Sequence, residues 1–226
     1  MMWKTFNLSE EGAMQIIVSF TVNHDIQKTY VYINPVTDRM TDSKRLEFAL
    51  RSHQMKRVFC QENWPLKVLK EYSTLVEQSD KTVLDTRCPM AVRLLRTLGL
   101  HDMVEAPIAP ILLSCAKELS HREDLVDGQI VVTTPCMALA EQGNLLKLPR
   151  TTFVTAREFL LEIGYHTAKR LDSSPIPPGF FDSLAIATVS ASGKEEIAEK
   201  AVSLPKDTEL FEVLFCPGGC HNGDGV

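Results

Sequence analysis

The stretch QIVVTTPCMALA, residues 129–140, shows how this chain is organised. Residues 130–134 are all β-branched, a composition typical of a buried strand in a parallel sheet. Pro135 ends this strand because proline fixes φ and has no amide hydrogen to donate. Cys136 then precedes an apolar segment that predicts a short helix. A strand that leads directly into a helix is the repeating unit of α/β proteins.

The same alternation of short apolar runs and amphipathic segments continues along the chain. Strands are predicted at residues 14–20, 29–33, 57–60, 81–86, 129–134, 151–155, 184–190 and 210–215. Helices are predicted at residues 43–54, 65–78, 90–100, 108–120, 156–171 and 194–202. The pattern predicts an α/β fold with largely parallel strands. The proline-rich segment at residues 172–182, which contains PIPPGFF, is predicted to be an internal linker because its prolines cannot continue a helix.

Length and charge narrow the classes of protein that the chain can represent. Its 226 residues fit one large domain or two small lobes. The net charge of −5 offers no basic stripe for nucleic acid. The first residues are polar where a secretory signal would be apolar, and no stretch is long enough to cross a bilayer. We therefore expect a cytoplasmic protein with no nucleic-acid or membrane partner.

In a reducing cytosol, cysteines are more often metal ligands or buried thiols than disulfides. Cys88 and Cys136 each follow a predicted strand and precede a helix, and Cys216 ends the last strand. Ligands of open α/β sheets bind at the carboxyl ends of the strands, so these thiols are expected to converge with Cys220. Bound metal would then hold the glycine-rich terminus in place. Cys60 and Cys115 have no such turn and are expected to be core thiols.

The four turn cysteines are Cys88, Cys136, Cys216 and Cys220, and their spacing along the chain favours one kind of metal centre. Four cysteine thiolates are the usual ligands of a 4Fe-4S cluster. Zinc also accepts four sulfurs, but structural zinc sites bring them as closely spaced pairs. Here only Cys216 and Cys220 are close, spaced C-x3-C, whereas Cys88 and Cys136 come singly from distant turns. The arrangement favours a cluster held between elements over a zinc ribbon.

Several motifs resemble one protein family. FCPGGCHNGDG, residues 215–225, resembles the third signature of the iron-only (FeFe) hydrogenase catalytic domain, C-P-G-G-C-x-x-G-G-G. VVTTPCMA, residues 131–138, lies where that family has M-P-C-x-x-K, and TTFVTAREF follows as the family's T-x-R-E segment does. LDTRCPMAV, residues 84–92, lies at the position of T-S-C-C-P-G-W. The resemblance covers roughly residues 57–225.

This resemblance implies a fold, a cofactor and a partner. The fold would be a single domain, residues 1–226, with two lobes of mainly parallel sheet flanked by helices. The lobes of such enzymes enclose an H-cluster, a 4Fe-4S cubane joined through one cysteine to a di-iron unit with CO and cyanide. The resemblance makes Cys88, Cys136, Cys216 and Cys220 the cubane ligands, with Cys220 as the bridge. No cysteine-rich ferredoxin-like segment precedes the domain, which implies a redox partner such as a ferredoxin or an accessory subunit.

The sequence also departs from the family pattern. Arg87 occupies the position of the cysteine that passes protons, and an always-charged guanidinium cannot donate and recover a proton near neutral pH. Leu139 replaces the lysine that binds a cyanide, Thr134 and Leu214 replace methionines, and Asp224 replaces a glycine. These changes argue against the di-iron unit and against ordinary turnover, so no catalytic residue is assigned.

We therefore expect an iron–sulfur protein of the iron-only hydrogenase type that binds a 4Fe-4S cluster and acts in redox sensing, hydrogen sensing or electron transfer. One alternative is an active minimal hydrogenase, an oxidoreductase that oxidises H2 or reduces protons. A further alternative is an iron–sulfur assembly factor.

Overall fold

The computed structural model describes residues 28–99 and 102–226, so the strand predicted at residues 14–20 lies outside the described residues. Two four-stranded sheets, each wholly parallel, form the two lobes, as the sequence predicts. The first sheet has the order β2-β1-β5-β6 and the second β4-β3-β8-β7. The strands are β1 (Lys28–Tyr32), β2 (Met55–Arg57), β3 (Val83–Leu84), β4 (Val104–Glu105), β5 (Gly128–Thr134), β6 (Thr151–Thr155), β7 (Thr188–Ser192) and β8 (Leu210–Leu214).

Helices cover both faces of each sheet. The α-helices are α1 (Pro35–Met40), α2 (Ser43–Ser52), α3 (Trp64–Glu77), α4 (Pro89–Thr97), α5 (Ile111–His121), α6 (Met137–Leu145), α7 (Ala156–Glu162) and α8 (Lys194–Val202). Two short 3-10 helices complete the described elements, η1 (Glu123–Leu125) and η2 (Cys220–Asn222). None of the helices in the described part of the chain is both long and apolar enough to span a lipid bilayer.

In the first lobe, successive strand residues pack on opposite helical layers. Val31 and Val131 pack with the α2 and α7 side chains, whereas Tyr30 and Ile130 pack with those of α5 and α6. This alternation follows from the period of two in a β-strand. Leu46 on α2 has no accessible surface, and full burial of such a side chain contributes about 1.5–3 kcal/mol.

The second lobe has the same layered organisation. Helices α4 and α8 cover one face of its sheet, where they pack against Phe211 and Val213. The other face is covered by α3 together with the segment predicted to be a linker. Within that segment Phe181 is fully buried and its ring lies 4.7 Å from that of Tyr72. The proline-rich segment is therefore a packed part of the second lobe.

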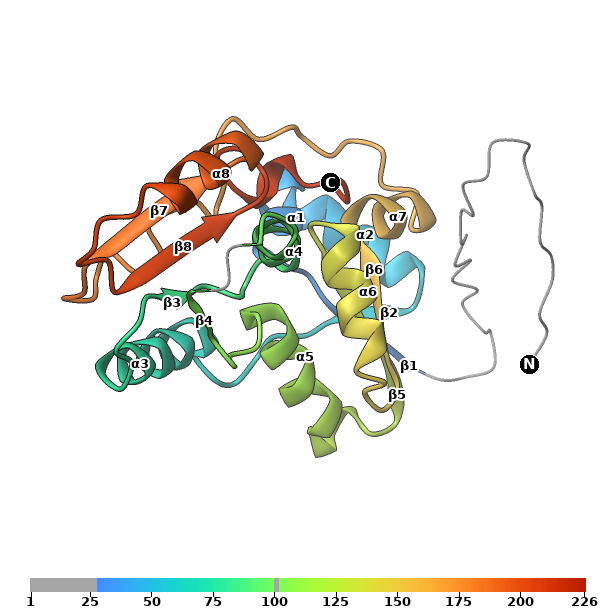
Figure 1. Ribbon diagram of the computed structural model, residues 1–226. Coiled ribbons are helices and arrows are strands. Elements are labelled where there is room, and N and C mark those ends of the chain that lie inside the picture. The colour runs from blue at the N-terminus through green and yellow to red at the C-terminus, as the bar shows by residue number, and fades with distance from the viewer. Residues whose placement is uncertain (1–27, 100–101) are drawn as a thin grey trace, which may run out of the picture.

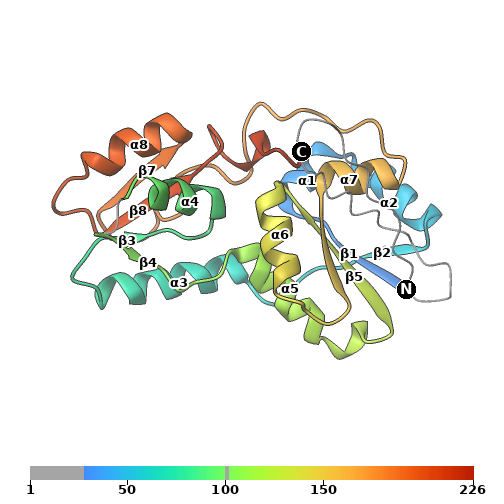
Figure 2. The same cartoon turned by 45° about the vertical axis from the view of Figure 1, so that its right-hand side comes forward.

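The chain passes between the lobes several times. It leaves the first lobe after β2, forms α3, β3, α4 and β4, and returns through α5 to β5. After α7 a long connection leads back to β7 and β8 (Figure 1). The segment that follows β8 then crosses again, so that the C-terminus lies beside α1 and α7 of the first lobe in both views (Figures 1 and 2).

The structure differs from the sequence prediction at several short segments. Residues 58–60 and 184–187, which were predicted to be parts of strands, lie outside β2 and β7. The helix predicted at residues 156–171 ends at Glu162, because Gly164 adopts a left-handed φ of 67°. Strand β4 and helix α1 were not predicted. Helix α1 is only six residues long, and it begins where the Asn34 side chain accepts hydrogen bonds from the amides of Val36 and Thr37.

Candidate metal centre

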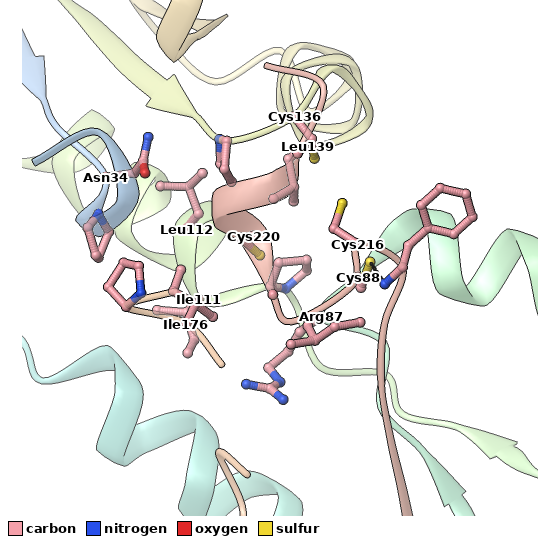
Figure 3. Close-up of a pocket in the computed structure, with 18 of the residues that line it drawn as sticks. Asn34, Arg87, Cys88, Ile111, Leu112, Cys136, Leu139, Ile176, Cys216 and Cys220 are labelled. Carbon is pink, nitrogen blue, oxygen red and sulfur yellow. Dashed lines mark hydrogen bonds between the residues drawn. The ribbon is translucent and has the colours of Figure 1, made fainter. Parts of the chain in front are cut away.

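A cavity of about 880 Å³ lies between the two lobes, and all four turn cysteines line it. The carboxyl ends of β5 from the first sheet and of β3 and β8 from the second lead into its wall. This is the edge at which α/β sheets bind ligands. Figure 3 shows the sulfur atoms of Cys88, Cys136, Cys216 and Cys220 gathered in one part of the cavity. The structure thus brings together the residues that the sequence singles out.

Two of these cysteines occupy the N-cap positions of helices. Cys88 precedes α4 and Cys136 precedes α6, and neither side chain makes a capping hydrogen bond. Both thiols are therefore available to the cavity. The partial positive charge at a helix N-terminus favours a thiolate there. In addition, the Phe215 amide donates to Cys88 Sγ at 3.4 Å.

Glycines shape the turn that carries the other two cysteines. Gly218 and Gly219 have φ angles of 69° and 117°, which L side chains rarely adopt. A Cβ on Gly219 would also lie 2.4 Å from the carbonyl oxygen of Ile176. Only glycine lets the turn fold back closely enough for Cys216 and Cys220 to reach the same cavity.

Hydrogen bonds within the chain hold the glycine-rich terminus. The Gly225 amide donates to the Pro135 carbonyl at 3.2 Å, and the Arg157 amide donates to the Gly225 carbonyl at 2.9 Å. Asp224 Oδ1 accepts from the amide of Met137 at 2.9 Å, in the first turn of α6. The tail is thus fixed to the loop that carries the Cys136 thiol. The sequence predicts metal as the anchor, whereas the described contacts provide one without it.

The environment of the four thiols disfavours ionisation without a bound cation. Burial raises the pKa of Cys136 to about 12 and that of Cys216 to about 11. Burial also raises the pKa of Cys88 and of Cys220. Neighbouring members of the group add to this effect, since the charge of Cys88 raises the pKa of the other three. A metal centre here would therefore replace thiol protons as it binds.

The donor set fits a cluster better than a single ion. Across residues 28–99 and 102–226, no three His, Cys, Asp or Glu side chains lie close enough together to share one metal ion. A 4Fe-4S cluster does not need such a group, because each cysteine binds a different iron of the cubane. The four free thiols line one cavity, and a cluster would need only one of them at each iron.

Arg87, which the sequence resemblance aligns with the proton-passing cysteine of FeFe hydrogenases, is held in a buried ionic cluster. Its Nε and Nη2 donate to both carboxylate oxygens of Asp85 at 2.8–3.1 Å. Nη2 also donates to Glu212 Oε1 at 2.8 Å. Both carboxylates have no accessible surface. Figure 3 shows the guanidinium directed away from the four sulfur atoms.

The same cluster attaches the proline-rich segment to the second sheet. Glu212 accepts hydrogen bonds from the amides of Gly179 and Phe180 at 2.7 and 3.0 Å. The Arg87 guanidinium lies 4.1 Å from the ring centre of Phe180 and 4.5 Å from that of Phe181. Arg87 thus has a structural role, because it joins the two buried carboxylates to the proline-rich segment. The sequence shows Asp85 two positions away, but it gives no sign of the contact with Glu212 across 125 positions.

The rest of the cavity wall is mostly apolar. It includes Leu139, which the sequence resemblance aligns with a lysine of FeFe hydrogenases and which Figure 3 shows beside Cys136. Ile111, Leu112 and Ile176 line other parts of the wall. Cys60 and Cys115, which the sequence assigns to the core, also line it. Cys115 is buried in the core as predicted, and Cys60 is partly buried against the same cluster of apolar side chains. Residue spacing could not reveal that both also line the cavity, because this depends on contacts between distant segments.

Comparison with models of protein families and with curated protein sequences finds no match to this chain. Among solved structures, a cysteine-to-histidine variant of the apo FeFe-hydrogenase HydA1 from Chlamydomonas reinhardtii is similar, with a TM-score of 0.57. The two are 14% identical, and the match covers 88% of this chain and 79% of that chain. The chain therefore has a hydrogenase-like fold. At this identity the similarity supports the fold of the two lobes and not a shared activity.

Proposed function

We propose that the chain is an iron–sulfur protein that binds one 4Fe-4S cluster through four cysteines and uses it for electron transfer or for sensing redox state or hydrogen. The observation that carries the proposal is the presence of four free thiols that line one cavity between the lobes. They come from three separate turns and belong to both lobes. The proposed ligands are Cys88, Cys136, Cys216 and Cys220.

The surrounding residues suit such a centre. The N-termini of α4 and α6, together with the Phe215 amide, would stabilise the negative charge of the ligated sulfurs. Apolar and proline side chains form most of the remaining wall. A bound 4Fe-4S cluster exchanges one electron at a potential that depends on hydrogen bonds to its sulfurs, on charge and on exposure.

We further propose that electrons pass between this site and a redox partner, such as a ferredoxin or an accessory subunit. Pro217 and Gly218, which follow Cys216, are exposed on the surface. This turn therefore gives a short covalent route from the proposed ligand Cys216 to a docked protein. A partner that contacts the turn would approach the centre without any rearrangement of either lobe.

Iron and acid-labile sulfide in anaerobically purified protein test this proposal. We expect about four irons and four sulfides per chain, and a cubane-type paramagnetic signal after reduction. Zinc bound in place of iron, or protein that takes up neither iron nor sulfide on reconstitution, would contradict it.

An active hydrogenase is the second candidate, and the size of the cavity favours it. The cavity extends beyond the four thiols to Tyr32 and Asn34, which leaves room for a second inorganic group. Against it, Arg87 is a fixed cation in an ion pair, and Leu139 offers no donor to a cyanide ligand.

Infrared spectra of protein matured with hydrogenase assembly factors separate the two functions. CO and cyanide bands would support the hydrogenase, and their absence with an intact cubane would support the first proposal.

A further inference from the structure

Two more thiols line the cavity and are not among the proposed cluster ligands. Cys60 lies in the loop after β2, and Cys115 lies in the middle of α5. Both are free thiols. Cys115 is buried, and Cys60 is partly exposed. They form a site of their own beside Tyr32 of β1.

The loop that carries Cys60 is fastened to α5 on either side of this residue. Before it, the Phe59 carbonyl accepts a hydrogen bond from Arg122 Nη1 at 2.6 Å. After it, the amide of Gln61 donates to Glu118 Oε1 at 2.6 Å. Glu118 lies three positions after Cys115 and therefore on the same face of α5, and Arg122 is the residue that directly follows this helix. The Cys60 side chain is therefore held against that face.

The three side chains lie together in the cavity wall. The Tyr32 hydroxyl donates to Cys115 Sγ at 3.5 Å, and the Cys60 thiol is close enough to Cys115 for each thiol to shift the pKa of the other. The Cys60 thiol, followed by the hydrogen bond from Tyr32, lowers the pKa of Cys115. The Cys115 thiol raises the pKa of Cys60. The Cys115 thiol therefore ionises more readily than the Cys60 thiol.

We propose that Cys60 and Cys115 form a redox-active dithiol that hydrogen peroxide converts to a disulfide. The Cys115 thiolate attacks one oxygen of the peroxide, an S–O bond forms, the O–O bond breaks, and hydroxide leaves and takes up the thiol proton as water. The Cys60 sulfur then attacks the Cys115 sulfur, an S–S bond forms, and the S–O bond breaks with release of a second water. The peroxide gains the two electrons that the thiols lose.

The geometry supports each step of this reaction. Peroxide is small enough to reach the buried sulfur through the cavity that both thiols line. The Tyr32 hydroxyl would stabilise the attacking thiolate, and the anchored loop keeps the resolving thiol beside it. The site uses none of the four proposed cluster ligands, so it does not depend on the proposed function.

Peptide mapping of the reduced full-length chain tests the proposal. One equivalent of peroxide is added without oxygen, free thiols are alkylated, and trypsin is used without a reductant. We expect a cross-linked product of residues 58–67 and 97–117, which contain Cys60 and Cys115. Alkylation of both peptides after peroxide, or cross-links that join them only to the other cysteines, would overturn the proposal.

Two variants separate a chemical role from a structural one. With Cys60→Ser, the sulfenic acid on Cys115 has no resolving thiol, and we expect dimedone to label residues 97–117. With Tyr32→Phe, loss of a hydrogen bond to the thiolate should slow the reaction with peroxide by about tenfold. A rate that is unchanged in a Tyr32→Phe protein with native circular dichroism, or no dimedone adduct in Cys60→Ser, would also overturn the proposal.

Discussion

Arg87 differs from a surface arginine because it neutralises two buried carboxylates. Its guanidinium is shared by two carboxylates without accessible surface, those of Asp85 and Glu212. Arg87→Leu would leave both carboxylates without their cation, so we expect a loss of about 3–5 kcal/mol in the free energy of unfolding. Denaturant titration measures this loss.

A matched control uses an ion pair on the surface. Arg96 pairs with Glu105, and the Arg96 side chain is 63% exposed. Arg96→Ala should therefore change the free energy of unfolding by no more than about 1 kcal/mol. Equal effects of the Arg87 and Arg96 substitutions would show that the buried ionic cluster does not stabilise the second lobe.

Cys136 offers the sharpest test of the candidate ligands, since it is the one that begins a helix of the first lobe. Cys136→Ala removes one of four sulfurs, and we expect the affinity for iron to fall by more than the roughly 10–100-fold that outer-shell groups contribute. Cys60→Ala is the matched control, because Cys60 lines the same cavity without being a proposed ligand. Normal iron content in Cys136→Ala would remove this residue from the site.

At the scale of elements, the terminal turn requires glycine at position 223, where the chain packs against the Pro135 carbonyl. A Cβ on Gly223 would lie 2.2 Å from the Pro135 carbonyl oxygen. Gly223→Ala must therefore displace the tail and Cys220 with it, and we expect a loss of stability of about 1–3 kcal/mol together with lower iron content.

Gly164→Ala controls for the backbone effect of such a substitution. Gly164 has a φ of 67° but no atom within 4 Å of its hypothetical Cβ. Gly164→Ala should lower the free energy of unfolding by about 1–2 kcal/mol, because alanine is strained in a left-handed backbone conformation, and it should leave the iron content unchanged. Loss of iron in both glycine variants would show that global stability, and not the position of the tail, controls loading.

Elements with strong periodic signals were predictable from sequence, and short ones were not. The β-branched run of β5 and the amphipathic pattern of α3 follow directly from residue types. Strand β4 has only two residues, too few to show any period. The position of the cysteines after strands predicted their convergence on one cavity. The contact of Arg87 with Glu212 and the presence of Cys60 and Cys115 in the same cavity wall depend on contacts between distant segments, which no local pattern encodes.

At the scale of the whole molecule, the candidate site joins the two lobes. Cys88 and Cys216 follow strands of the second sheet, whereas Cys136 follows a strand of the first. The tail that carries Cys220 starts in the second lobe and is fixed to loops of the first. A ligand bound by all four would restrain the lobes as one unit, since it binds the folded chain and not the unfolded one.

This arrangement predicts that binding of the cluster stabilises the entire fold. A ligand present at about 1,000 times its dissociation constant adds about 4 kcal/mol to the free energy of unfolding, and for a chain of this size that raises Tm by roughly 10 °C. Thermal unfolding of loaded protein, before and after removal of iron by a chelator, measures the shift, and both lobes should unfold in a single transition when loaded. Cys136→Ala protein should show no shift, because its lobes would no longer be joined through a complete ligand set. If iron stays bound while Tm is unchanged, or if the second lobe alone gains stability, the metal does not bridge the lobes and the first-lobe cysteine is not a ligand.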